Sequence, residues 1–325
     1  MNSVNKSDIR EGIFKTLNNK FGLKILNFSQ IDLGYLNLKW KVKTDVGDLF
    51  VKQYNKIRYP DHRINELEIS LHHQAKLLQE GIPCPQLYAH NGKYVNRTSD
   101  GTNFVLMGLC EGTNIKPGAA NEEQVYSLGK IIARIHQILN SDNAGKPPLH
   151  WNLRSKDSML KDLQNRRCEA ISMDCDKTIS ILDTQKKIIE TTNLNIFSDC
   201  EQGWCHWDLF SDNILFKPDG VSAILDFDRM HYVYPEFDIS RPILSCCMKD
   251  GRIDVNKVSA FVKGYREYQT LTKQQLVRSI KLTWWKEAEW VRVEEKQNSS
   301  LKRFTEENIW VGENWDHLES LFAKV

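Results

Sequence analysis

Polar residues with a fixed spacing stand out in the stretch 205–229. His206 and Asp208 are separated by one residue, and Asn213 follows Asp208 after four more. Asp226 comes later, at the end of an apolar run. Carboxylate and amide oxygens in such a group can accept a proton from a hydroxyl group and can bind a hard divalent cation.

A hairpin is predicted to bring these residues together. Two apolar runs, 215–216 and 221–225, have the composition of strands. The residues between them, 217–220, include a proline and a glycine and are typical of a tight turn. Because the chain folds back over this turn, Asn213 at one end and Asp226 at the other are expected to lie close together.

The chemistry that this group suits is phosphoryl transfer. That reaction needs a carboxylate to orient and deprotonate an attacking hydroxyl group, and oxygen ligands for magnesium on the phosphates. Asp208 fits the first role, and Asn213 with Asp226 fits the second. The spacing equals the pattern H-x-D-x-x-x-x-N followed by an Asp-Phe pair. Such a three-residue pattern should arise by accident in roughly one chain in twenty of this length, so coincidence is the weaker interpretation.

These motifs resemble those of the aminoglycoside phosphotransferase and choline kinase family, the small-molecule branch of the protein-kinase-like fold. The chain departs from the family at Trp207, where a small residue is usual. It departs from protein kinases in having Asp226-Phe227-Asp228 in place of Asp-Phe-Gly, and no Ala-Pro-Glu sequence follows. The second departure argues against a regulated protein kinase with an activation segment.

The resemblance also implies residues that support the catalytic loop. His206 would pack and hydrogen-bond the backbone near the metal-binding aspartate, and Asp238 would steady the loop from below. Asp228 is assigned to the same supporting group. His136, within an apolar helical pattern over 121–139, is expected to be a packed, hydrogen-bonded core histidine.

The first hundred residues predict an antiparallel sheet. A helix is expected over 6–21, followed by strand-like runs at 23–32, 38–44 and 48–53. Between the first two runs, the segment that contains Gly34 and Asn37 is interpreted as a nucleotide loop. It has a single glycine, so an ordinary hairpin turn is an equally good interpretation.

Lys52 ends an apolar strand, as the phosphate-binding lysine does in kinases. Lys41 and Lys43, on the preceding strand, are less well placed. A helix predicted over 63–80 must then supply the acidic partner of Lys52. Glu66 and Glu68 are both candidates, and Glu68 is preferred because it lies beside the apolar stripe of that helix.

The resemblance places a hinge at 107–109, where backbone groups would bind the adenine edge, so Met107 and Leu109 are assigned to the nucleotide site. The boundary between lobes is therefore expected near residue 110, with a nucleotide-binding lobe over 1–110 and a catalytic and substrate-binding lobe over 111–325. The predicted fold is α+β and bilobed, with an antiparallel sheet and one long helix in the first lobe and mainly helices in the second.

The acceptor side of the site is the least determined. The segment 153–192 is predicted to be a charged helical insertion without assignable contacts. Trp284, Trp285 and Glu287 are chosen as candidate acceptor-site residues, because family acceptors bind in C-terminal helices. Packing between helices is the alternative for the tryptophans, and it is favoured because aromatic residues dominate cores.

Bulk properties narrow the class of protein. The 325 residues carry a net charge of +2, which gives no reason to expect nucleic acid or a membrane surface as a partner. The segment 1–12 is polar and lacks the apolar region of a secretory signal, and no apolar stretch approaches membrane-spanning length. Eight scattered cysteines without paired C-x-x-C spacing predict reduced thiols in a cytoplasmic protein, whose oligomeric state is left open.

The resemblance implies ATP as the phosphate donor and Mg²⁺ as the cofactor, although the preference for ATP over GTP is open. The acceptor would be a hydroxyl group of a small molecule such as an aminoglycoside, choline, homoserine or methylthioribose. The alternative is a catalytically silent kinase-like protein that binds nucleotide or has a structural role, as in spore coats. Retention of Asp208, Asn213 and Asp226 argues against that alternative.

Overall fold

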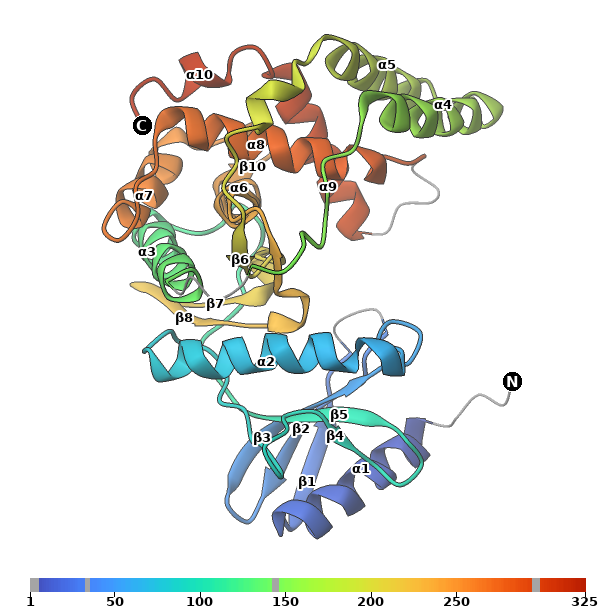
Figure 1. Ribbon diagram of the computed structural model, residues 1–325, viewed down its shortest axis with the longest axis vertical. Helices are drawn as coiled ribbons and strands as arrows, with labels where there is room; N and C mark the ends of the chain where they lie inside the picture. Colours follow the sequence, from blue (N-terminus) through green and yellow to red (C-terminus); the bar gives the residue numbers. More distant parts are fainter. Residues whose placement is uncertain (1–5, 33–35, 142–145, 294–298) are drawn as a thin grey trace. The chain divides into compact units, whose positions relative to one another are not determined.

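The computed structural model describes residues 6–32, 36–141, 146–293 and 299–325 (Figure 1). The chain divides into two compact units. The first comprises the residues up to Gly112 together with Ser222–Arg229, and the second comprises Thr113–Val221 and the residues from Met230 onward. The first compact unit ends at Gly112 along the chain, and Ser222–Arg229 groups with it. The functional division into lobes near residue 110 stays a prediction.

The first unit is built on an antiparallel sheet in which the strands follow the order β1-β2-β3-β5-β4. The strands are β1 (Ile25–Gln30), β2 (Lys39–Thr44), β3 (Gly47–Tyr54), β4 (Asn96–Arg97) and β5 (Asn103–Gly108). Turns at 45–46 and 98–102 join β2 to β3 and β4 to β5. The predicted antiparallel sheet is therefore confirmed.

Helices cover the two faces of this sheet, because side chains alternate along each strand. Helix α1 (Lys6–Phe21) packs Ile13 and Leu17 against Trp40 and Val51 on one face. Helix α2 (Ile64–Gln79), preceded by the short helix η1 (Asp61–Arg63), packs against the other face. Figure 1 shows the sheet between α1 and α2. The cluster on the α2 side contains Tyr54, Tyr59, Leu67, Leu71, Leu87 and Val105.

The second unit is mainly helical, as predicted. Its longer helices are α3 (Glu122–Leu139), α4 (Lys156–Ser172), α5 (Asp176–Thr191), α6 (Glu236–Cys247), α7 (Val255–Tyr265), α8 (Lys273–Glu287) and α9 (Ser299–Glu313). The short helices are α10 (Leu318–Leu321), η2 (Leu194–Phe197), η3 (Ser211–Asn213) and η5 (Ala288–Trp290), and η4 (Phe227–Arg229) belongs to the first unit. The short strands of this unit are β6 (Gly203–Cys205), β7 (Ile214–Lys217), β9 (His231–Val233), β10 (Met248–Lys249) and β11 (Arg252–Ile253). Strand β8 (Gly220–Ile224) begins in this unit and ends in the first, and β7 pairs with it as the predicted hairpin.

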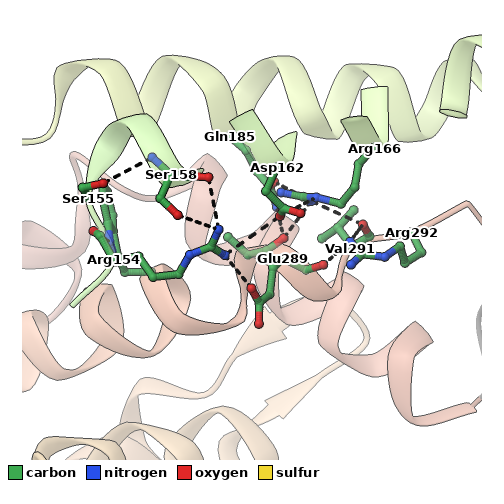
Figure 2. Close-up of polar contacts among 11 residues, drawn as sticks. Arg154, Ser155, Ser158, Asp162, Arg166, Gln185, Glu289, Val291 and Arg292 are labelled. Carbon is green, nitrogen blue, oxygen red and sulfur yellow. Dashed lines mark hydrogen bonds and ion pairs between the residues drawn. The ribbon is translucent and has the colours of Figure 1, made fainter. Parts of the chain in front are cut away.

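The segment 153–192 forms the helix pair α4 and α5, which polar contacts attach to η5 (Figure 2). Arg154 bonds the carboxylate of Glu289. The buried guanidinium of Arg166 donates to the carbonyl oxygens of Ala288 and Val291 at 2.9 and 3.3 Å. The insertion is therefore fixed to the helical unit through the residues that follow α8.

Helices α3 and α7 cross where glycines allow their backbones to touch. A Cβ atom at Gly129 would overlap the carbonyl oxygen of Phe261, and one at Gly264 would overlap the carbonyl oxygen of Tyr126. Gly129→Ala and Gly264→Ala are each expected to lower the free energy of unfolding by about 1–3 kcal/mol, because the helices must move apart. Chemical denaturation measures this change.

Gly312→Ala in α9 is the matched control. A Cβ atom there would meet only side-chain atoms, the nearest at 3.5 Å, which is ordinary van der Waals contact. Its free energy of unfolding should stay equal or rise slightly, because alanine favours helix over glycine. An unchanged stability in both crossing variants would contradict the importance of the close approach.

Within the described residues, no helix is both long and apolar enough to cross a membrane.

Candidate active site

Lys52 of β3 lies at the centre of a buried polar cluster in the first unit. Its ammonium group is 2.8 Å from Asp226 Oδ1 and 2.5 Å from Asp228 Oδ2. The hydroxyl groups of Tyr54 and Tyr59 donate to the two oxygens of Asp228 at 3.0 and 3.3 Å. Lys52 and Asp228 keep 3% and 8% of their surface exposed, so this cluster is fixed by hydrogen bonds with little help from water.

The charges in this cluster shift one another's pKa values. Burial alone would lower the pKa of Lys52, but the carboxylates of Asp226 and Asp228 outweigh burial and raise it. Burial would raise the pKa of Asp226, but Lys52 outweighs burial and holds that pKa below its usual range. For Asp228, burial and the neighbouring Asp226 raise the pKa. Lys52 therefore stays cationic, as a ligand of phosphate oxygens must.

The predicted pairing of Lys52 with Glu68 is wrong. The carboxylate of Glu68 accepts hydrogen bonds from the backbone N–H groups of Tyr94 and Val95 at 2.6 and 2.9 Å, and so ties α2 to the segment before β4. Glu66, the other candidate, is exposed and lies 3.3 Å from Arg63. Asp228, assigned only a supporting role from the sequence, takes the place of a helical glutamate beside Lys52.

The other predicted nucleotide residues also belong to the first unit. Gly34 lies outside the described residues. Asn37 Oδ1 accepts from the backbone N–H group of Asn55 at 3.0 Å, so this oxygen fixes the start of β2 to the end of β3. Met107 lies in β5, and Leu109 directly follows that strand and is 38% exposed. Adenine binding at 107–109 stays a prediction.

Asp208 lies in the loop between β6 and η3 and keeps 9% of its surface exposed. Asn213 Nδ2 donates to the backbone carbonyl of Asp208 at 2.8 Å and to its carboxylate at 3.3 Å. The backbone N–H group of Asp208 donates to His206 Nδ1 at 3.3 Å, and His206 is fully buried. The loop thus holds the predicted base and one predicted metal ligand together, with His206 packed as expected.

Asp238 of α6 supports this loop, as the sequence predicted. Its carboxylate accepts from the backbone N–H groups of His206 and Trp207 at 2.6 and 2.8 Å. His136 Nε2 lies 3.3 Å from the same carboxylate, and His136 Nδ1 lies 2.8 Å from the hydroxyl group of Tyr265. His136 is therefore the buried, hydrogen-bonded histidine expected from its helix.

Backbone strain occurs at two positions of the site. Trp207 has φ of 62° and Asp226 has φ of 59°, which is the left-handed region that residues with a Cβ atom seldom adopt. The bonds from Asp238 to the loop offset the cost at Trp207, and the ion pair with Lys52 does so at Asp226. Such strained positions concentrate where a structure must aim particular side chains.

The predicted acceptor-site residues on α8 are buried and do not line an open site. Trp284 and Trp285 are 2% and 0% exposed, and their indole N–H groups donate to the carbonyl oxygens of Asn308 and Arg154. Glu287 is paired with the buried Arg241 of α6. The assignment of all three residues to the acceptor site is therefore corrected to packing between helices, because an apolar indole is stabilised by burial.

Arg241 connects the helix that carries Asp238 to the C-terminal helices. Its guanidinium bonds Glu287 of α8 and Glu307 of α9, and all three side chains are buried. A buried charge is tolerated only when it is paired, so these contacts hold α6 in place between α8 and α9. The whole of α6 is buried, which makes it a rigid support for the loop around Asp208.

Sequence reasoning missed the tyrosines that surround Asp228. Tyr54 could have been found, because it lies two positions after Lys52 on the same strand and so on the same face of the sheet. Tyr59 lies in the segment before η1, whose path has no periodic signal. Lys52 was identified from the apolar residues next to it in the sequence. The contact of Tyr59 with Asp228 depends on the path of a segment without regular structure.

The sequence of this chain is similar to those of known phosphotransferases. A family model described as the phosphotransferase enzyme family matches residues 27–271. The homoserine kinase of Methylobacillus flagellatus is 24% identical over 258 residues, which are 78% of this chain and 74% of that protein. The homoserine kinase of Granulibacter bethesdensis is 24% identical over 251 residues, or 76% of this chain and 74% of that protein.

Solved structures show the same fold. A spectinomycin phosphotransferase, solved with ADP and spectinomycin, has a TM-score of 0.63 at 16% identity and covers 93% of this chain and 96% of its own. An aminoglycoside phosphotransferase from Alicyclobacillus acidocaldarius has a TM-score of 0.63 at 13% identity, with 95% of each chain covered. These likenesses confirm the predicted fold, and the family match confirms the predicted resemblance. The chain belongs to the phosphotransferase enzyme family.

Proposed function

We propose that this chain phosphorylates the hydroxyl group of a small amino-acid alcohol with ATP, and that L-homoserine is the first candidate. As a member of its family, the chain is a phosphotransferase that acts on a hydroxyl group of a small molecule. The choice of L-homoserine as the acceptor rests on the sequence match to homoserine kinases, which covers about three quarters of both chains. The likeness to antibiotic kinases is a likeness of fold alone.

Charges beside the catalytic loop support an acceptor with a carboxylate. The ammonium group of Lys286 lies 5.0, 5.1 and 5.3 Å from the ring centroids of Trp207, Phe237 and Trp290. Lys286 is also 3.8 Å from Glu287. These aromatic rings already surround a cation of the protein itself, which disfavours choline, and the positive charge disfavours a polycationic aminoglycoside. The Lys286 side chain is 11% exposed, and an α-carboxylate near it would carry the opposite charge.

Each candidate residue would have a distinct role in the reaction. Asp208 would orient the acceptor hydroxyl group and take its proton as the oxygen attacks the γ-phosphorus atom. Lys52 would bind phosphate oxygens of ATP, with Asp226 and Asp228 fixing the position of its ammonium group. ADP leaves as the bond between the γ-phosphorus and the bridging oxygen breaks.

Asn213 and Asp226 have the donor atoms that Mg²⁺ prefers. Among the described residues, the amide oxygen of Asn213 accepts no hydrogen bond, since its contacts use Nδ2. Asp226 Oδ1 is bonded to Lys52, whereas Asp226 Oδ2 accepts no hydrogen bond from any residue that the structure describes. These two oxygens would hold Mg²⁺, which when bound neutralises charge on the phosphates. Their joint coordination of one ion stays a prediction.

The proposal is tested by measuring ADP release from ATP and Mg²⁺ with a panel of acceptors. The panel should include L-homoserine, L-threonine, choline, methylthioribose, kanamycin and spectinomycin. L-Homoserine is expected to give the highest kcat/KM, and its product should carry phosphate on the side-chain oxygen by mass spectrometry. A cytoplasmic location also stays a prediction, which cell fractionation would test.

Two results would contradict the proposal in different ways. A higher kcat/KM with an aminoglycoside or with choline would overturn the acceptor and keep the phosphotransferase. Binding of ATP without transfer to any hydroxyl compound would favour the silent kinase-like alternative.

A further inference from the structure

Lys39 of β2 stands directly beside Lys52 in the sheet. The antiparallel register pairs Lys39 with Lys52, so both side chains project from the same face. Directly opposite residues have Cβ atoms about 4.5–5.5 Å apart, and two like charges at such positions destabilise a sheet. The first unit therefore places two cations side by side where one lysine would satisfy the known chemistry.

The surroundings of Lys39 do not neutralise it. Lys52 is bonded to Asp226 and Asp228, and Tyr54 and Tyr59 also bond Asp228. The side chain of Lys39 is half-buried. Its backbone carbonyl accepts from the N–H group of Ile31, but its ammonium group has no hydrogen bond or ion pair with any residue that the structure describes. By contrast, Lys41, two positions along the same strand, lies 3.0 Å from Asp48.

The charges around Lys39 leave a positive excess. Lys39, Lys52 and Arg58 all interact electrostatically with Asp226, so three cations face the two carboxylates of Asp226 and Asp228. Burial, and then the charge of Lys52, lower the pKa of Lys39. An anion bound beside the two lysines would relieve this repulsion. A polyphosphate has the required charge and several oxygens that can each accept a hydrogen bond.

We propose that Lys39 is a second cationic ligand of the nucleotide phosphates, acting beside Lys52. This inference rests on the proposed use of ATP, and it adds a residue that the catalytic motifs do not indicate. Lysine suits the role because its ammonium group is a compact charge with three donors on a flexible stem. The affinity it adds should grow with the number of phosphates, because the ligand's adenosine part has no charge for it to contact.

Nucleotide binding to the full chain tests the inference. Calorimetry should measure the dissociation constants of ATP, ADP and AMP, with Mg²⁺, for the wild type and for Lys39→Met. The variant is expected to bind ATP about 10-fold or more weakly, with a smaller loss for AMP, as for a charged hydrogen bond removed. Lys39→Arg should stay within about 3-fold of the wild type for ATP, because it keeps the charge.

Lys43→Met is the matched control. Lys43 lies on the same strand and the same face, but farther from Lys52, and it is exposed. Its affinity for ATP should equal that of the wild type. Thermal unfolding without nucleotide provides a second measurement: Lys39→Met should be at least as stable as the wild type, since a repulsion is removed.

The outcomes separate this inference from the function on which it rests. Unchanged ATP affinity in Lys39→Met, with a loss in Lys52→Met, would overturn the role of Lys39 and leave the kinase assignment standing. Equal losses in Lys39→Met and Lys39→Arg, or a marked loss of stability in Lys39→Met, would show a structural role and overturn the inference. A wild-type chain that binds no nucleotide would overturn both.

Discussion

Asp208→Asn is expected to lower kcat for phosphate transfer by about 10²–10⁴-fold, while the dissociation constant for ATP stays close to that of the wild type. Asparagine has the size of aspartate, and its amide oxygen can still accept from Asn213 Nδ2, which lies 3.3 Å from the native carboxylate. It cannot take the proton of the acceptor hydroxyl group. The loss therefore falls on the chemical step, which single-turnover measurement of ADP formation isolates from binding.

Asp212→Asn is the control for that experiment. Asp212 lies in η3, four residues after Asp208, and it is exposed and takes no part in the proposed chemistry. The same change of charge there should leave kcat near that of the wild type. Comparable turnover in the Asp208 and Asp212 variants would refute the assignment of Asp208 as the base, whatever the acceptor is.

The elements around the site could be predicted because their signals are local. The helix expected over 6–21 is α1, and the helix expected over 121–139 is α3, which begins after Asn121. Asn121 caps that helix by accepting from the backbone N–H group of Gln124, an interaction within one turn of chain. The loop of Asp208 and Asn213 is similarly local, so its spacing alone indicated its chemistry.

The partner of Lys52 could not be predicted in the same way. Helical periodicity indicated correctly that Glu68 lies beside the apolar stripe of α2. Periodicity does not identify the backbone N–H groups that hydrogen-bond its carboxylate. The N–H groups of Tyr94 and Val95 reach Glu68 from a distant segment, and a carboxylate that accepts two such bonds is satisfied without a lysine. Lys52 then pairs with carboxylates that follow β8.

The tryptophans of α8 illustrate a second limit. An aromatic residue can form a wall of a ligand site or fill a core, and the sequence has the same composition in both cases. Burial of Trp284 and Trp285 follows from the positions of α9, Arg154 and Phe197, which the sequence of α8 does not encode. The position of Lys39, in contrast, could have been predicted from the sequence. Pairing Thr44 with Gly47 across the turn at 45–46 fixes the register and places Lys39 opposite Lys52.

Asp238→Ala is expected to reduce both stability and turnover, because Asp238 holds the catalytic loop from α6. Its removal leaves the backbone N–H groups of the buried His206 and the partly buried Trp207 without their acceptor. Unmade bonds of this kind cost about 1–3 kcal/mol each, so the free energy of unfolding should fall by about 2–5 kcal/mol. A displaced loop should also lower kcat by about 100-fold, since small errors in the position of a reacting group have effects of that size.

Tyr265→Phe separates the effect of a displaced catalytic loop on kcat from the effect of lower stability. It removes the hydroxyl group 2.8 Å from His136, one contact farther from the loop, and keeps both bonds from Asp238 to the backbone. Its free energy of unfolding should fall by about 0.5–1.5 kcal/mol with kcat close to that of the wild type. Asp238→Asn, which keeps one acceptor oxygen, should fall between wild type and Asp238→Ala in kcat. If kcat instead followed stability alone across Asp238→Ala, Asp238→Asn and Tyr265→Phe, Asp238 would be a core residue that does not orient Asp208. The left-handed backbone conformation of Trp207 would then have no role in catalysis.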